Sequence, residues 1–306
     1  MNGKGRLGEF LQTRRSQLQP EDLGIPGYGE RRRVPGLRRE ELASLAGVSV
    51  SYYTRLEQGQ SLNASPQVLD AIARALRLEE AERLHLHDLA RSSATATGTG
   101  RGRRAAPERV TEATGQLLEA LAHVPAIVTG RRSDVLAWNR LGHALFAGHL
   151  DPGAPDRPAD RPNMARLVFL DAHTRDLYAD WPAKARAVVG NLRLVAGRHP
   201  DDTALHALVG ELSSKSADFA SMWSDHRVTA CAVATYEMRH PLVGPLTVIQ
   251  QTLSQGQGQG PDQGQNIVVA TTEADSTART TLALLDQVTP QHDPARQGNP
   301  GRLPLT

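Results

Sequence analysis

Residues 40 to 59 read EELASLAGVSVSYYTRLEQG, and this stretch decides the fold of the N-terminal third of the chain. It predicts two short helices, over residues 38–46 and 49–58, joined by a tight turn at Gly47. The turn requires glycine because the chain reverses sharply between the helices, in a conformation that a Cβ would disfavour. Ser49 is a favourable N-cap for the second helix. The pattern therefore predicts two helices held at a fixed angle.

The two faces of the second helix differ in chemistry. Tyr53 and Leu56 are the apolar residues that face the core. A rotation of 100° per residue then places Ser51, Arg55 and Gln58 on the opposite face. Such a polar outer face suits insertion into the major groove of DNA. The alternative, a solvated surface in an ordinary helical domain, explains less well the small and apolar inward positions Leu42, Ala43, Ala46 and Val48.

Nine residues around the turn are candidates for DNA contact. Arg55 suits a bidentate contact with guanine, and Val50 suits a contact with a thymine methyl group. Arg38 and Arg39 stand at the start of the first helix, where side chains and free backbone N–H groups favour phosphate. The full set is Arg38, Arg39, Ser49, Val50, Ser51, Tyr52, Thr54, Arg55 and Gln58.

The N-terminal segment is basic although the whole chain is nearly neutral. The formal net charge is +2, whereas residues 1–39 hold nine Lys or Arg against four Asp or Glu. A clustered basic face is the electrostatic signature of phosphate binding. Arg31, Arg32 and Arg33 lie in the loop before the motif, and two readings stay open for them. Either they reach phosphates or an adjacent minor groove, or they are simply solvated.

The stretch LASLAGVSVSYYTRLEQG resembles the helix-turn-helix of phage-repressor-like (XRE/Cro-type) regulators, and the likeness covers residues 6–90. Tyr53 departs from that family, where an aliphatic residue is usual. The longer loop ending in RRRVPGLRREELA resembles that of the MmyB-like regulators. The resemblance implies double-stranded DNA as partner, a homodimer that reads paired half-sites, and an internal ion pair between Arg15 and Glu57.

Residues 6–90 predict a compact all-α domain of five helices. Outside the motif these are 6–18, a helix capped by Ser65 with Pro66 at its first position, and 79–90. Residues 91–107 are small, polar and basic, without apolar periodicity, and predict a flexible linker.

Residues 108–286 predict a second domain, built around one sheet. Runs rich in Val, Thr and Ile predict strands at 126–129, 135–138, 226–238, 243–253 and 266–272. Helices are expected at 110–122, 141–146, 163–178, 182–197 and 205–212. Strands at both ends with helices between them favour an α+β fold. Residues 255–265 (QGQGQGPDQGQ) predict a loop, and residues 287–306 a disordered tail.

The sequence contains no recognisable catalytic constellation. Cys231 has no neighbouring His and is interpreted as a buried structural thiol. Asp171 with His173, and His85 with His87, are weak metal-ligand patterns because two-residue spacing has no supporting cluster. No glycine-rich phosphate loop and no GxSxG occur. We therefore expect neither enzyme activity nor a metal or cofactor.

The cysteine count and the hydropathy pattern indicate the cellular compartment in which the protein functions. One cysteine excludes an intrachain disulfide and fits a reducing compartment. The sequence lacks the charged start and following apolar run that are typical of a secretion signal. No stretch reaches the roughly 18 apolar residues of a membrane span. We expect a cytoplasmic protein that does not associate with membranes.

The run VLAWNRLGHALF (135–146) resembles the strand-to-helix turn of PAS-like sensor domains, with Asn139 capping the helix. The segments NMARLVFLDAHTRDLYADWPAKARAVVGNLR (163–193), FASMWSDHRV and HPLVGPLTVIQQTL are similar in order and spacing to the ligand-binding domain of MmyB-like regulators over residues 108–286. The resemblance implies a PAS-like sheet and a cavity for a small apolar molecule such as a fatty acid. The large apolar candidates for its lining are Trp138, Phe169, Trp181, Val189, Leu192, Met222 and Trp223.

The sequence thus predicts an α-helical N-terminal helix-turn-helix domain followed by an α+β PAS-like C-terminal domain. Two functions stay open for the second domain. In the first, a ligand changes the spacing of two DNA-binding domains in a dimer. In the second, the domain only dimerises or docks another protein, and no ligand is involved.

Overall fold

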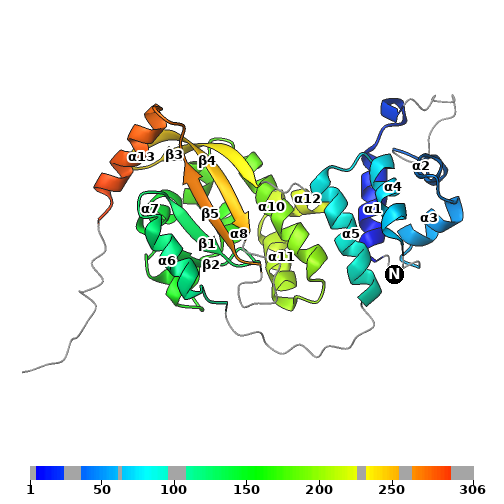
Figure 1. Ribbon diagram of the computed structural model, residues 1–306, viewed down its shortest axis with the longest axis horizontal. Coiled ribbons are helices and arrows are strands. Elements are labelled where there is room, and N and C mark those ends of the chain that lie inside the picture. Colours follow the sequence, from blue (N-terminus) through cyan, green and yellow to red (C-terminus); the bar gives the residue numbers. More distant parts are fainter. Residues whose placement is uncertain are drawn as a thin grey trace, which may run out of the picture. The chain divides into compact units, whose positions relative to one another are not determined.

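The computed structural model describes residues 5–23, 36–60, 64–95, 108–225, 232–254 and 264–290 (Figure 1). The chain divides into two compact units. The helical unit comprises residues 1–106, 168–170 and 182–231, and the sheet unit comprises residues 107–167, 171–181 and 232–306. The predictions for Arg31, Arg32, Arg33, Cys231, residues 255–263 and the tail from residue 291 concern positions outside the described residues.

The N-terminal part of the helical unit consists of five α-helices around one apolar core. They are α1 (Arg6–Gln17), α2 (Arg39–Ala46), α3 (Val50–Glu57), α4 (Pro66–Ala75) and α5 (Glu80–Thr95), with a short 3-10 helix at Pro20–Leu23. Phe10 of α1 and Leu42 of α2 are among the fully buried side chains of this core. The predicted cap of α4 is present, since Ser65 Oγ accepts a hydrogen bond from the Val68 N–H.

Helix α5 is longer than predicted, and its last turn lies in the segment 91–95 that was interpreted as linker. No Gly or Pro interrupts residues 91–95, so nothing in their covalent chemistry stops the helix. The unit also contains α10 (Trp181–Arg198, from residue 182 onward), α11 (Thr203–Lys215) and α12 (Ala217–Ser224). Helix α12 was not predicted; its N-cap is Ser216, whose Oγ accepts from the Phe219 N–H at 3.1 Å.

The sheet unit contains an antiparallel sheet of five strands (Figure 1). They are β1 (Ala126–Thr129), β2 (Val135–Trp138), β3 (Val233–His240), β4 (Gly244–Ser254) and β5 (Asn266–Thr271), in the order β2-β1-β5-β4-β3. The last strand in the sequence is therefore the central strand of the sheet. Ile127 of β1 pairs with Val268 of β5, and Tyr236 of β3 pairs with Val248 of β4.

Several helices of the sheet unit pack against its strands. The helices of this unit are α6 (Glu112–Ala120), α7 (Arg140–Ala147), α8 (Met164–Leu170, whose last three residues belong to the helical unit), α9 (Ala172–Leu177) and α13 (Thr277–Val288), with a 3-10 turn at Ala154–Asp156. Helix α7 packs against β1 and β2, and α13 packs against β4 and α7. Asn139 caps α7 as predicted, because its Oδ1 accepts from the Gly142 N–H at 2.7 Å.

Several elements after residue 160 differ from the prediction. The helix expected over 163–178 is broken into α8 and α9 at Asp171, whose Oδ1 accepts from the Thr174 N–H at 2.7 Å and caps a new helix. Strand β3 begins at Val233, and the expected strand residues 226–231 lie outside the described part of the chain. Helix α13 was not predicted and runs to Val288, two residues beyond the predicted end of the domain.

The predicted fold class is confirmed: helices precede an α+β region with one sheet. Within the described residues, no helix has both the length and the apolar character that a bilayer crossing requires.

Candidate functional site

The turn between α2 and α3 has the geometry that the sequence predicts. Gly47 has φ 66° and ψ 30°, a left-handed conformation that glycine adopts without penalty. The Val48 N–H donates to the Ala43 carbonyl at 3.0 Å and closes the end of α2. Ser49 Oγ accepts from the Tyr52 N–H at 3.2 Å and opens α3. Both helix ends at the turn are therefore satisfied by local hydrogen bonds.

Helix α3 buries one face and exposes the other. Tyr53 and Leu56 are fully buried, whereas Ser51, Arg55 and Gln58 are exposed. The exposed residues lie where the helical rotation places them. Of the other candidates for DNA contact, Arg38, Ser49 and Val50 are exposed, and Arg39, Tyr52 and Thr54 are half-buried.

Glu57 is buried behind this face and links α1, α2 and α3. Its side chain is 1% exposed, and its carboxylate lies 2.7 Å from Arg15 Nε and 2.6 Å from Arg39 Nε. Burial alone would raise the pKa of Glu57, but hydrogen bonds from Arg15 and Arg39 outweigh it and hold that pKa below its ordinary value. Burial would likewise lower the pKa of Arg15, yet Glu57 raises it. The implied ion pair of Arg15 and Glu57 is confirmed, and both groups are charged.

Arg39 differs from its neighbour Arg38. Its Nε contacts Glu57, while its side chain stays 37% exposed. Arg38 is exposed, and its backbone N–H donates to Glu41 Oε2 at 2.7 Å. The contact between Arg39 and Glu57 was not foreseen, because the two residues belong to different helices. Arg39 therefore combines a fixed internal partner with an accessible edge, and its predicted phosphate contact stays a prediction.

The sheet unit contains a cavity of about 570 Å³. Its wall is formed by the end of β2, helix α7, residues 148–152, helix α9, the β3–β4 hairpin and the chain after α13. Large apolar side chains in the wall are Trp138, Leu150, Leu242 and Val288. Trp138 is anchored by its Nε1, which donates to the Pro152 carbonyl at 2.7 Å. A cavity of this size is within the range of small-molecule sites.

Histidines supply much of the polar lining, namely His143, His149, His173 and His240. His240 Nε2 donates to the Ala144 carbonyl at 3.0 Å, and its Nδ1 accepts from the Leu242 N–H at 3.3 Å. These two bonds require the neutral ring. Burial lowers the pKa of His240 and also that of His149, whose Nε2 lies 3.3 Å from Asp171 Oδ1. The rings of His240 and His149 are therefore uncharged near neutral pH.

Comparison with known families separates the chain into two matched regions. The MmyB-like transcription regulator ligand binding domain matches residues 110–285, more than half of the chain. The chain belongs to the MmyB-like transcription regulators. A helix-turn-helix domain matches residues 6–86, so this MmyB-like regulator carries its DNA-binding region before its ligand-binding domain. A comparison with curated proteins finds no match. The protein is a DNA-binding transcription regulator.

The seven residues predicted to line a ligand cavity in this MmyB-like regulator divide between the two units. Trp138 lines the cavity of the sheet unit, and Trp223 lines a second cavity in the helical unit. Trp181 lies beneath the Arg175 guanidinium, 3.8 Å from its carbon. The remaining four, Phe169, Val189, Leu192 and Met222, belong to the helical unit, and all but Met222 are buried. Size and apolarity alone do not distinguish a cavity wall from a packed core.

Sequence reasoning missed the histidines of the sheet-unit cavity as a cluster, since it considered His173 only beside Asp171. These histidines come from separate segments, and the available signal was that His143 interrupts the otherwise apolar residues 141–146. The described part of the chain holds no group of three or more His, Cys, Asp or Glu placed to bind a metal, so neither Asp171 with His173 nor His85 with His87 belongs to such a group. His87 instead contacts Asp70 at 2.9 Å, and His85 packs edge-on against Phe10.

Proposed function

We propose that this MmyB-like regulator reads paired DNA half-sites as a homodimer, and that a small apolar ligand such as a fatty acid controls how it does so. The observation that supports DNA reading by α3 is its division into a buried face and an exposed face that contains Ser51, Arg55 and Gln58. The protein acts without catalysis, so ligand binding, rather than a reaction, is the input to the switch.

In the proposed complex, each part of the motif has a separate role. Arg55 lies on the exposed face of α3 and contacts a guanine, while Val50, 40% exposed, contacts a thymine methyl group. Arg38 and the accessible edge of Arg39 contact phosphates at the start of α2. Ser49, Ser51, Tyr52, Thr54 and Gln58 complete the contact surface. Base contacts then come from α3 and positioning contacts from α2.

Replacing Arg55 by Ala tests the placement of α3. A binding site selected from random DNA provides the probe, and fluorescence anisotropy measures affinity for that site and for each of its single-base variants. Arg55→Ala should cost about 1–3 kcal/mol and relax preference at one base position. Arg74→Ala, which removes the same charge from an exposed position on α4, should leave the preference intact. An Arg55→Ala protein with unchanged sequence preference would refute the proposed contact.

The cavity of the sheet unit supports the ligand part of the proposal. It joins an apolar wall around Trp138 and Leu150 to a polar pair, His149 and His173, whose rings lie 4.0 Å apart. This combination suits a molecule with an apolar body and one polar end. Helix-turn-helix dimers read half-sites at a fixed separation, so a ligand that changes the dimer changes which DNA is bound.

Native mass spectrometry of the gently purified protein tests ligand and dimer together. We expect a dimer that carries a small apolar molecule, or an emptied dimer that takes up laurate. Laurate should then alter affinity for the selected DNA, and His173→Ala should weaken laurate uptake. The matched control is His123→Ala, because His123 is exposed and lies outside the lining of this cavity. A dimer that neither retains a molecule nor binds laurate would favour the alternative in which the domain only dimerises or docks a protein.

A further inference from the structure

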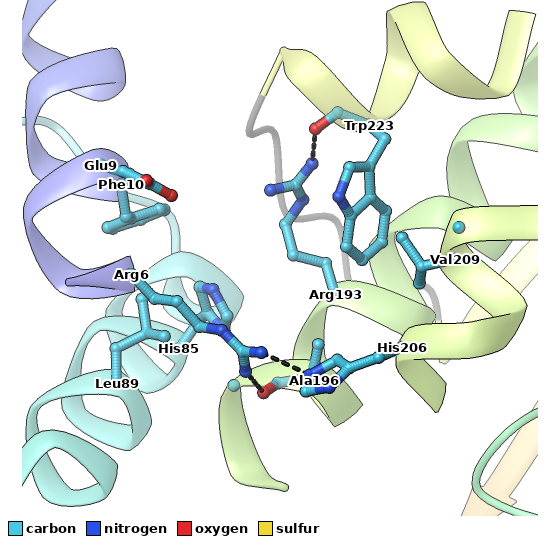
Figure 2. Close-up of a pocket in the computed structure, with 12 residues that line it drawn as sticks. Arg6, Glu9, Phe10, His85, Leu89, Arg193, Ala196, His206, Val209 and Trp223 are labelled. Atoms are coloured by element: carbon cyan, nitrogen blue, oxygen red, sulfur yellow. Dashed lines mark hydrogen bonds between the residues drawn. The ribbon is translucent and has the colours of Figure 1, made fainter. Parts of the chain in front are cut away.

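The helical unit contains a second cavity, of about 340 Å³, where the DNA-binding helices meet helices of the ligand-binding domain (Figure 2). One wall comes from α1 and α5 and includes Phe10 and Leu89. The facing wall comes from α10, α11 and α12 and includes Arg193, Val209 and Trp223. The two walls therefore derive from the two regions that match different families.

Specific contacts hold these two walls together. Arg6 Nη1 donates to the Ala196 carbonyl at 2.9 Å, and Arg6 Nη2 contacts His206 (Figure 2). Arg198 Nε lies 2.9 Å from Asp88 Oδ2. A Cβ at Gly197 would lie 2.6 Å from the ring of His85, so a larger residue on α10 would have to displace that ring on α5.

The cavity is mainly apolar with a cationic side. Each wall contains a flat aromatic side chain. Phe10, which is 1% exposed, lies in the wall from α1, and Trp223 lies in the facing wall. The Trp223 ring stacks on that of Phe219, with the ring centroids 5.6 Å apart. The Arg193 guanidinium lies 4.6 Å above the Trp223 ring, and burial lowers the pKa of Arg193 to about 10, although Asp225 opposes this shift. Arg193 stays protonated at neutral pH. Among the lining residues, Arg6 and Arg193 outnumber the single acid, Glu9, which is exposed.

We propose that this cavity is a binding site for a small aromatic carboxylate that contacts the DNA-binding helices and the ligand-binding domain at the same time. The ring lies between Phe10 and Trp223, and the carboxylate accepts hydrogen bonds on the side of Arg6 and Arg193. The volume lies at the small end of the range for ligand sites, which favours a molecule smaller than a fatty acid. The site is separate from the sheet-unit cavity and does not depend on its occupant.

Such a ligand acts on the anchoring of the DNA-binding helices rather than by covering the helix that reads DNA. Ser51, Arg55 and Gln58 are exposed, whereas the cavity is lined from α1 and α5. A molecule that bridges the walls binds only the docked arrangement, and it stabilises that arrangement by mass action. The DNA-binding helices then have less freedom to reorient toward a half-site.

Isothermal titration calorimetry on the full chain tests the site with 1-naphthoate and its neutral counterpart 1-naphthalenemethanol. We expect both to bind, and 1-naphthoate to bind more tightly. Arg6→Met keeps the apolar stem but removes the charge and the contact with the Ala196 carbonyl. Both probes should weaken, and 1-naphthoate should lose about tenfold more affinity than the alcohol, as expected for one charge-assisted hydrogen bond. Equal weakening of both probes, or of neither, would overturn the assignment of Arg6 as the carboxylate partner.

Gly210 allows the cavity to be filled with a matched control. It lies on α11 in the cavity wall, and an added Cβ there meets nothing within 4 Å. Gly210→Phe should abolish binding of both probes, whereas Gly210→Ala should keep affinity within about twofold, since the methyl group leaves most of the volume free. Val209→Phe repeats the test from the neighbouring position if thermal melting shows that Gly210→Phe does not fold. Undiminished binding in the folded filling variant would rule out this cavity.

Hydrogen exchange measured by mass spectrometry tests whether the ligand bridges both walls. Saturating 1-naphthoate should slow exchange in peptides from α1 and α5 as well as in those from α10 and α11. Protection confined to α10 and α11 would contradict the bridging site. The laurate experiment reads the other cavity, so the two proposals can fail independently.

Discussion

The helix-turn-helix region and the sheet unit bury ionisable groups in opposite states. Behind α3, Glu57 is charged and lies between two arginines, Arg15 and Arg39. In the sheet unit, His240 is buried in a hydrogen-bonding arrangement that only the neutral ring satisfies. A buried charge therefore fixes the scaffold behind α3, whereas burial in the cavity wall favours the uncharged rings of His240 and His149. An uncharged imidazole beside an apolar molecule loses less hydration free energy than an imidazolium would.

The largest expected loss of stability comes from replacing Glu57 with Gln. The variant keeps the volume but leaves the guanidinium of Arg15, which is 7% exposed, without its counter-charge. Removing one partner of a buried ion pair costs about 3–5 kcal/mol, so we expect the helix-turn-helix region to unfold at lower denaturant and to lose DNA binding. Urea unfolding followed by hydrogen exchange in peptides of α1 to α4 measures the effect.

Glu80→Gln is the control for this prediction. Glu80 forms an exposed pair with Arg83 on α5, so its loss should leave unfolding unchanged. If Glu57→Gln proved as harmless as Glu80→Gln, the ion pair would not be what holds α1, α2 and α3 together.

A smaller effect, confined to the sheet unit, is expected from Gly142→Ala. Gly142 lies on α7, and a Cβ there would stand 2.2 Å from the Ala126 carbonyl oxygen of β1. Helix and strand must separate, which should cost about 1–3 kcal/mol. Thermal melting compares this variant with Gly115→Ala on α6, where an added Cβ meets nothing within 4 Å and helix propensity should raise stability by about 0.5–1 kcal/mol. A tolerated Gly142→Ala would show that β1 and α7 are loosely packed.

The smallest expected effect is a difference between the two regions in how their stability depends on pH. The pKa values of His240 and His149 lie below 6.5 in the folded protein, so both histidines contribute stability above pH 6.5 that is lost as pH falls through their folded values. The pKa of Glu57 lies below 4.5, so its contribution persists until pH falls below 4.5. The sheet unit should therefore weaken on mild acidification before the helix-turn-helix region does.

Hydrogen exchange of each region at pH 7.5 and pH 5.5, corrected for the intrinsic rate, measures this order. His240→Gln, which cannot be protonated, should reduce the loss of protection in the sheet unit. Equal weakening of both regions between these two pH values would contradict the proposed states of the buried groups.

The two regions also differ in how much their sequences reveal. The turn at Gly47, the cap at Ser49 and the exposed face of α3 are set by neighbours along the chain, and all could be predicted. The contact of Arg39 with Glu57 could not, because it depends on how two helices cross.

In the ligand-binding domain the short strands β1 and β2 were predicted at their observed bounds. The cavity could not be predicted, since its histidines meet only after α7, α9 and the end of β3 have packed. Large apolar residues such as Val189 and Leu192 look identical in sequence whether they fill a core or line a cavity.

The strand order has a consequence for folding during synthesis on the ribosome. The central strand β5 is made last, and about 130 residues separate the end of β2 from the end of β5. At a synthesis rate of about 5–20 residues per second, the β1–β2 hairpin waits about 7–26 seconds for its partner. During that interval β1 presents an unpaired edge of backbone groups, a template for pairing with other chains. The helix-turn-helix, whose helices end by residue 95, has no such wait. The nascent ligand-binding domain is therefore the part of this regulator that is exposed longest to pairing with other chains.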